Sequence, residues 1–89
     1  MTIASPWQLD RDRLEEALAL WKRRRRFGDQ RYVDEFLMDL VEDPFECGEE
    51  DGDSGVWTGL AGPPGRRIVI VYVPTLETRR VAVADINYG

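Results

Sequence analysis

The sequence predicts one α+β domain in which two N-terminal helices pack as an antiparallel pair on one face of a small, mostly antiparallel sheet. Three observations support this two-layer sandwich, with the element order β-α-α-β-β-β. Two adjacent segments in the first half carry apolar residues at helical spacing. The second half contains two apolar runs that are joined by a short turn. The chain has 89 residues, a length that suits a single domain, 1–89, with one core.

The first helix is expected over residues 10–27, after a short edge strand at residues 2–4. Asp10 is a suitable N-cap, because its side chain can accept a hydrogen bond from an amide of the first turn. An apolar stripe at spacing i, i+4 and i+7 follows, formed by Leu14, Leu18 and Trp21. The basic run at residues 22–26 falls at the helix C-terminus, where cations interact favourably with the helix dipole.

The second helix is expected over residues 30–43. Residues 27–29 separate it from the first helix, with Gly28 in the left-handed conformation and Asp29 as the new N-cap. Its apolar stripe is complete and consists of Val33, Phe36, Leu37, Leu40 and Val41. Pro44 is expected to end the helix.

Three strands are expected in the second half, over residues 55–60, 66–73 and 79–86. Residues 68–73 are apolar at every position, which is typical of a strand that is central in its sheet or covered on both faces. Pro74 is expected to end this strand because it cannot donate to the sheet. The last two strands must pair antiparallel, since a parallel return needs roughly a dozen residues of connection. Residues 46–55 are expected to form an acidic loop.

The predicted core draws on both helices and on the two apolar strands. It includes Leu18, Trp21, Phe36, Leu40, Val69, Val71 and Val83. The three tryptophans, Trp7, Trp21 and Trp57, are interpreted as core or interface residues before stacking platforms for bases.

The charge is divided into three segments. Residues 1–33 have eight basic and five acidic side chains, residues 34–53 have ten acidic and no basic ones, and residues 54–89 have four basic and two acidic ones. The resulting net charges of +3, −10 and +2 sum to the −5 of the whole chain. Nonspecific affinity for nucleic acid comes from local basic clusters, so the acidic total weakens that interpretation without excluding it.

The composition also excludes several kinds of site. There is no histidine, so His-ligated metals and Ser-His catalysis are not available. The single cysteine, Cys47, cannot form an internal disulfide, and its acidic neighbours argue against a reactive thiolate. Counted from Asp51, the acidic loop has no glycine at the sixth position and no glutamate at the twelfth position of an EF-hand, so no metal and no cofactor is predicted. The chain has no apolar run of about 18 residues and no signal peptide, which predicts a cytoplasmic protein without a membrane partner.

The pattern of two helices around Phe-Gly-Asp resembles the N-terminal half of toxins of the RelE/ParE superfamily, as does the end of the second helix at residues 40–45, LVEDPF. The runs at 56–60, VWTGL, and 68–73, IVIVYV, resemble the C-terminal half. This resemblance covers nearly the whole chain. It lies in the order and lengths of the helices and strands and in the turn residues that separate them. It implies the toxin of a type II toxin–antitoxin pair, with a cognate antitoxin as partner. The target would be mRNA on the ribosome, for an mRNA interferase, or DNA gyrase, for a non-nuclease member.

An RNA-cleaving member needs cations that stabilise the transition-state phosphate and a group that transfers a proton. The candidate catalytic residues are Arg66, Arg67 and Tyr88, with Asp85 as a second proton-transfer candidate. In an antiparallel hairpin the two arginines lie near Tyr88, and their charge would have to lower the pKa of its phenol. The other arginine pair, at residues 79–80, lies at the turn, ~20 Å away. The antitoxin is expected to dock on the basic run, which consists of Lys22, Arg23, Arg24, Arg25 and Arg26.

Two departures from the family pattern favour an alternative hypothesis. Val69 stands where RelE-like enzymes carry a catalytic arginine, and Asn87 stands where a basic residue is expected. The alternative is a non-catalytic RelE/ParE-like interaction domain, either a gyrase-type inhibitor or an acidic adaptor that binds a basic partner. Each candidate also has a structural interpretation. The hairpin arginines can be charges that keep the hairpin soluble, Tyr88 can be a packing residue, and the basic run can be a solvated helix end.

Overall fold

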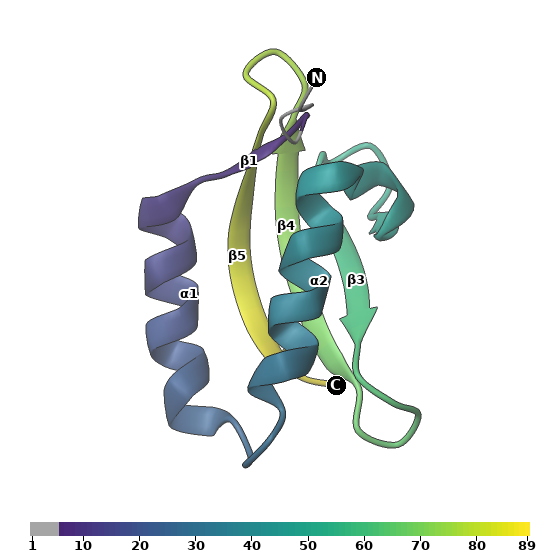
Figure 1. Cartoon of the computed structure of the whole chain (residues 1–89). Coiled ribbons are helices and arrows are strands. Elements are labelled where there is room, and N and C mark those ends of the chain that lie inside the picture. Colours follow the sequence, from purple (N-terminus) through teal and green to yellow (C-terminus); the bar gives the residue numbers. More distant parts are fainter. Residues whose placement is uncertain (1–5) are drawn as a thin grey trace, which may run out of the picture.

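The computed structural model describes residues 6–89, which form a layer of two helices against one sheet (Figure 1). The elements in chain order are β1 (Gln8–Leu9), α1 (Arg11–Arg24), α2 (Gln30–Glu42), the short 3-10 helix η1 (Pro44–Glu46), β2 (Gly48–Glu50), β3 (Trp57–Ala61), β4 (Ile68–Thr75) and β5 (Arg80–Tyr88). The predicted α+β class and the antiparallel C-terminal hairpin are confirmed. The strand predicted at residues 2–4 lies outside the described residues.

The sheet has five strands in the order β1-β5-β4-β3-β2, so β4 is central. The pairs β5–β4, β4–β3 and β3–β2 are antiparallel, whereas β1 is parallel to β5. Both helices lie on the same side of this sheet (Figure 1). Strand β4 therefore has a hydrogen-bonded strand on each of its edges, which agrees with the central position predicted for it.

Strand β1 is short, and this leaves most of one edge of β5 without a strand partner in residues 6–89. Its two residues pair only with Arg80 and Val81 of β5. After Leu9 the chain turns away into α1, whose N-cap is Asp10 as predicted: the Asp10 carboxylate accepts from the amide of Arg13 at 3.2 Å.

Helix α1 ends at Arg24, earlier than the predicted residue 27. The backbone becomes extended at Arg25, with ψ 143°, and the amide of Arg26 donates to the Tyr88 hydroxyl instead of to a helix carbonyl. A turn then closes with a hydrogen bond from the Asp29 amide to the Arg26 carbonyl, at 3.2 Å. Gly28 has the positive φ, 87°, that was predicted for it. The end of α1 is therefore set by a tertiary contact with β5.

The core lies between the helices and the inner face of the sheet. The predicted burial of Trp21, Phe36, Leu40 and Val83 is confirmed, and Leu18 is partly buried. The predicted facing of β4 was wrong. Its fully buried residues are Ile68, Ile70 and Tyr72, whereas Val69 and Val71 point to the outer face and are half-buried. A strand that is apolar at every position contains no alternation that sets which face is buried.

The outer face of the sheet is not covered by either helix (Figure 1). Its partly exposed apolar residues are Leu60, Val69, Val71 and Val73. Leu60 has 55% of its surface exposed, and Thr58 and Asp85 border Val71 on the neighbouring strands.

Two local predictions in the second half were also wrong. Residues 46–55 are not entirely a loop, because Gly48–Glu50 pairs with β3 as an edge strand. Strands β2 and β3 can approach closely because Gly48 lies opposite Gly59, and a Cβ at either position would collide with neighbouring atoms. This pairing does not depend on apolar side chains. Strand β4 continues through Pro74 to Thr75. It can do so because its pairing with β3 stops at Tyr72, so that edge of β4 needs no amide donor at Pro74.

Candidate functional site

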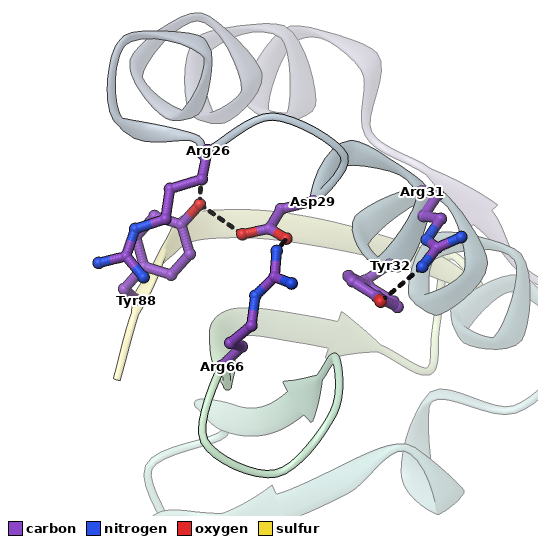
Figure 2. A network of polar contacts seen from close by, with 6 residues as sticks. All are labelled: Arg26, Asp29, Arg31, Tyr32, Arg66 and Tyr88. Atoms are coloured by element: carbon purple, nitrogen blue, oxygen red, sulfur yellow. Dashed lines mark hydrogen bonds and ion pairs between the residues drawn. The ribbon is translucent and has the colours of Figure 1, made fainter.

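Asp29 is the one charged residue among residues 6–89 whose side chain is fully buried. It flanks the N-terminus of α2 but makes no capping hydrogen bond there, contrary to its predicted role as a cap. Its carboxylate instead points toward the sheet, where Oδ1 pairs with the guanidinium of Arg66 and Oδ2 accepts from the Tyr88 hydroxyl at 2.8 Å (Figure 2). Asp29 thus joins the loop between the helices to the turn before β4 and to the end of β5.

This arrangement balances the buried carboxylate. A buried charge is costly unless it is paired and its remaining lone pairs are hydrogen-bonded. Arg66 supplies the positive charge and Tyr88 the second donor. The Arg66 side chain is 47% exposed, so the guanidinium is hydrated on one side while the carboxylate is fully desolvated. The ion pair is therefore more important for the Asp29 carboxylate, which water cannot solvate, than for the Arg66 guanidinium.

Tyr88 contacts three residues of the helical hairpin: Trp21, Arg26 and Asp29. Its hydroxyl accepts from the Arg26 amide at 2.6 Å while donating to Asp29 (Figure 2). Its ring packs at 5.0 Å from the ring of Trp21, and the Arg26 guanidinium lies 5.0 Å from its ring centre. Burial, together with the hydrogen bond to the Asp29 carboxylate, raises the pKa of Tyr88 despite the lowering effect of Arg26. A catalytic role required Arg66 and Arg67 to lower this pKa, whereas its net shift is upward.

The remaining members of the predicted site occupy separate positions. The Arg67 side chain donates to the carbonyl of Gly62 at 3.1 Å, within its own turn, and forms no hydrogen bond or ion pair with Asp29 or Tyr88. Arg79 and Arg80 lie at the β4–β5 turn, at the opposite end of the sheet from the loop between the helices (Figure 1). The two arginine pairs therefore lie at opposite ends of the sheet, as predicted, and of the first pair only Arg66 shares the Asp29 carboxylate with Tyr88.

The basic run predicted to bind a partner is exposed along its whole length. Arg24 is the member with an acidic partner: it lies 3.5 Å from Asp85 and also donates to the carbonyl of Ile86 at 3.4 Å. Arg25 donates to the side-chain carbonyl of Gln30 at 2.8 Å. Lys22 and Arg23 extend into solvent from the last turn of α1.

Sequence reasoning missed Gln30, which links this run to the core. Its side-chain carbonyl accepts from Trp21 Nε1 at 3.0 Å as well as from Arg25, and its amide donates to Asp34 at 2.8 Å. It missed the contacts of Asp29 for a similar reason, because an Asp after Phe-Gly is read equally well as a helix cap. No pattern in the sequence indicated either set of contacts.

The acidic segment forms a second surface, away from Asp29. A hollow of about 350 Å³ lies between α2, η1 and β3 and is lined by Phe36, Asp39, Glu42, Asp43, Glu46, Cys47 and Leu60. The Cys47 thiol donates to the carbonyl of Asp43 at 3.3 Å. Burial and the nearby carboxylates, first among them Asp39, raise the pKa of Cys47 to about 11, so the thiol is neutral at physiological pH. No group of three or more possible ligands in residues 6–89 is arranged to hold a metal ion.

Comparison with protein-family models, with curated proteins and with solved structures finds no match for this chain. Within residues 6–89, neither helix is long and apolar enough to cross a membrane.

Proposed function

We propose that this protein is a non-catalytic interaction domain that binds a basic protein partner through its acidic surface. One observation carries the proposal: the two best candidates for catalysis, Arg66 and Tyr88, are both engaged by the buried carboxylate of Asp29. Through Asp29, Arg66 and Tyr88 connect parts of the chain that are distant in sequence.

The same contacts make these residues poor catalytic groups. Stabilising a transition-state phosphate requires a cation whose charge is available, but the charge of Arg66 is offset by Asp29. A general base must accept a proton, whereas the Tyr88 hydroxyl donates its own to a carboxylate and has a raised pKa. Arg67 is turned away, toward Gly62.

The acidic surface has the features of a binding site for basic side chains. Residues 34–53 contain ten carboxylates and no cation. In the 350 Å³ hollow, four of these carboxylates surround Phe36, Cys47 and Leu60. A lysine or arginine side chain could place its alkyl portion against these three residues and its charged end against the carboxylates. Charge complementarity of this kind governs specificity and association rate.

The proposal is tested with a synthetic basic peptide as probe, by isothermal titration calorimetry at 50 and 200 mM salt. The variant Asp39→Asn/Glu42→Gln/Glu46→Gln removes three exposed charges that line the hollow. The matched control Asp12→Asn/Glu15→Gln/Glu16→Gln removes three exposed charges from α1. We expect the first variant to lose most of the affinity and the control to keep it. Equal losses in both variants would show attraction to net charge alone and would reject the site.

A second candidate function is that of a toxin of the RelE/ParE kind, and it is favoured by a different observation. Arg66, Tyr88 and Arg26 come together at one end of the molecule, next to the exposed basic run (Figure 2). In this case a cognate antitoxin would cover the basic run, and the target would be mRNA on the ribosome or DNA gyrase. Induction in a bacterial host, with growth, bulk translation and mRNA integrity followed, separates the two candidates. Growth arrest with cleaved mRNA that is lost in Tyr88→Phe but kept in Arg80→Ala would support the nuclease and reject the non-catalytic domain.

A further inference from the structure

The turn between the helices carries an aromatic side chain that packs against nothing. Phe27 is fully exposed, at 103% of its reference surface. It occupies the second position of the turn that the hydrogen bond between Asp29 and Arg26 closes, with Gly28 at the third position. A turn of this kind needs a positive φ at its third residue, and Gly28 provides it. The side chain of the second residue is then held away from the core.

Phe27 borders a hollow of about 580 Å³ that is rich in cations. The hollow is lined by Lys22, Arg25, Arg26, Phe27, Gly28 and Gln30. Three of these six residues are basic and none is acidic. The space beside Gly28 is open, since apart from Gly28 and its two chain neighbours no atom lies within 4 Å of a Cβ placed there.

The arginines of this hollow are held in place without being neutralised. Arg25 is fixed by Gln30, which is itself hydrogen-bonded to the buried Trp21. Arg26 lies over the ring of Tyr88. The ion pairs found within residues 6–89 involve only Arg24 and Arg66, so the cations of the hollow have no carboxylate partner in that part of the chain. A guanidinium has five N–H donors, and most of those on Arg25 and Arg26 remain available.

We propose that this hollow binds a nucleotide, with the phosphate on Lys22, Arg25 and Arg26 and the base stacked on Phe27. Guanidinium groups match phosphate oxygens in geometry and charge, and an exposed aromatic ring is a stacking surface for any base. The same chemistry is presented by a free nucleoside polyphosphate and by one unit of a single-stranded nucleic acid. The site is independent of the acidic surface, because it lies at the N-terminal end of α2 and the acidic hollow at the C-terminal end.

The test measures binding of four probes to the whole protein by calorimetry at 50 mM salt: ATP, inorganic tripolyphosphate, adenosine and a single-stranded hexanucleotide. We expect ATP or the hexanucleotide to bind at least about 5-fold more tightly than tripolyphosphate, because stacking adds to phosphate binding. Whichever of the two binds more tightly identifies the source of the nucleotide. Tripolyphosphate binding as tightly as both would overturn the proposal, and so would adenosine binding as tightly as both, because the phosphate would then contribute nothing.

Substitutions then assign the contacts. Phe27→Leu keeps an apolar side chain but removes the ring, and should weaken binding by about 5- to 100-fold, whereas Phe27→Trp should retain it. Arg25→Gln should weaken binding more than Arg23→Gln, which removes the same charge from an exposed residue that does not line the hollow. Circular dichroism confirms that each variant is folded. Unchanged affinity in Phe27→Leu, or equal losses in the two arginine variants, would reject the site.

Discussion

The hydroxyl of Tyr88, near the end of β5, donates to the carboxylate of Asp29, at the start of α2, across 2.8 Å and 59 positions of sequence. The same carboxylate forms an ion pair with Arg66, which lies in the turn before β4. Three segments that are distant in the chain are therefore held at one fully buried side chain (Figure 2). The tertiary structure at this end of the molecule depends on polar contacts as much as on apolar burial.

The two halves of the Asp29–Arg66 pair should respond differently to substitution. Arg66→Ala leaves a buried carboxylate without its cation, and we expect it to lower the free energy of unfolding by about 2–4 kcal/mol. Asp29→Asn leaves a half-exposed guanidinium that water can solvate, and an amide oxygen that still accepts from Tyr88. Its cost should be smaller, about 1–2 kcal/mol. Urea denaturation at pH 7 measures both.

The double variant provides the control for this asymmetry. Asp29→Asn in the Arg66→Ala background removes the uncompensated charge, so the double variant should be more stable than Arg66→Ala alone. If the two single costs were instead equal and additive, the buried charge would not be the reason for either of them.

Leu40→Ala tests the core between α2 and the sheet. Leu40 is fully buried, and its truncation should cost about 2–5 kcal/mol, because part of the cavity remains unfilled. Met38→Ala is the matched control on the same helix, since Met38 is 71% exposed and its loss should cost well under 1 kcal/mol. Similar denaturation midpoints for the two variants would contradict the way in which α2 is packed.

Gly59→Ala tests how closely α2 approaches β3. A Cβ at Gly59 would collide with the ring of Phe36 and lie 2.7 Å from the carbonyl oxygen of Cys47. We expect a cost of about 1–3 kcal/mol from this overpacking, measured by thermal or urea unfolding. Thr58→Ala, on the exposed side of the same strand, is the control and should change stability little. A stable Gly59→Ala variant would mean that the two elements lie further apart.

The thiol of Cys47 should titrate far above the ordinary range. Burial and the carboxylates of Asp39, Asp43 and Glu46 raise its pKa from 9.0 to about 11. The rate of alkylation by iodoacetamide should therefore rise with an inflection near pH 11 in the folded protein and near pH 9 in urea. Asp39→Asn should move the folded value downward. An inflection near pH 9 in the folded protein would show that the thiol is not buried as described.

The same shift has a consequence for stability. Because the folded pKa of Cys47 is raised above its unfolded value, its contribution is fully present below pH 9 and is lost as the pH rises toward 11. When the pH is raised from 8 to 11, Cys47→Ala should therefore lose less stability than the natural protein loses. Urea midpoints at the two pH values measure this difference. An identical decrease in both proteins would assign the alkaline loss to other groups.

The helices and the C-terminal hairpin could be predicted because each is specified by its own local pattern. The apolar stripe of α2 and the N-cap at Asp10 are examples that the structure confirms. The end of α1 could not be predicted, because it depends on the hydroxyl of Tyr88, a residue 62 positions away. The buried face of β4 could not be predicted either, since its apolar residues do not alternate with polar ones.

The candidate site was predicted in part. The geometry of an antiparallel hairpin was enough to bring Arg66 toward Tyr88. What lies between them, the carboxylate of Asp29, comes from the loop between the helices, and its position depends on how the helix layer docks on the sheet. Side-chain contacts between layers are decided by that docking, which no local sequence pattern encodes.

The shortness of β1 has a consequence for amide hydrogen exchange in β5. Among residues 6–89, β5 beyond Val81 has a strand neighbour on one edge only, which is β4. In an antiparallel pair, successive amides point alternately toward the partner and away from it. Amides that face β4 should therefore exchange only through global unfolding, while those between them exchange through solvent contact in the native state. The exchange rates along β5 should alternate with a period of two residues on each side of Ala84, where the register with β4 shifts. This edge of the sheet is where Arg24 donates to Ile86.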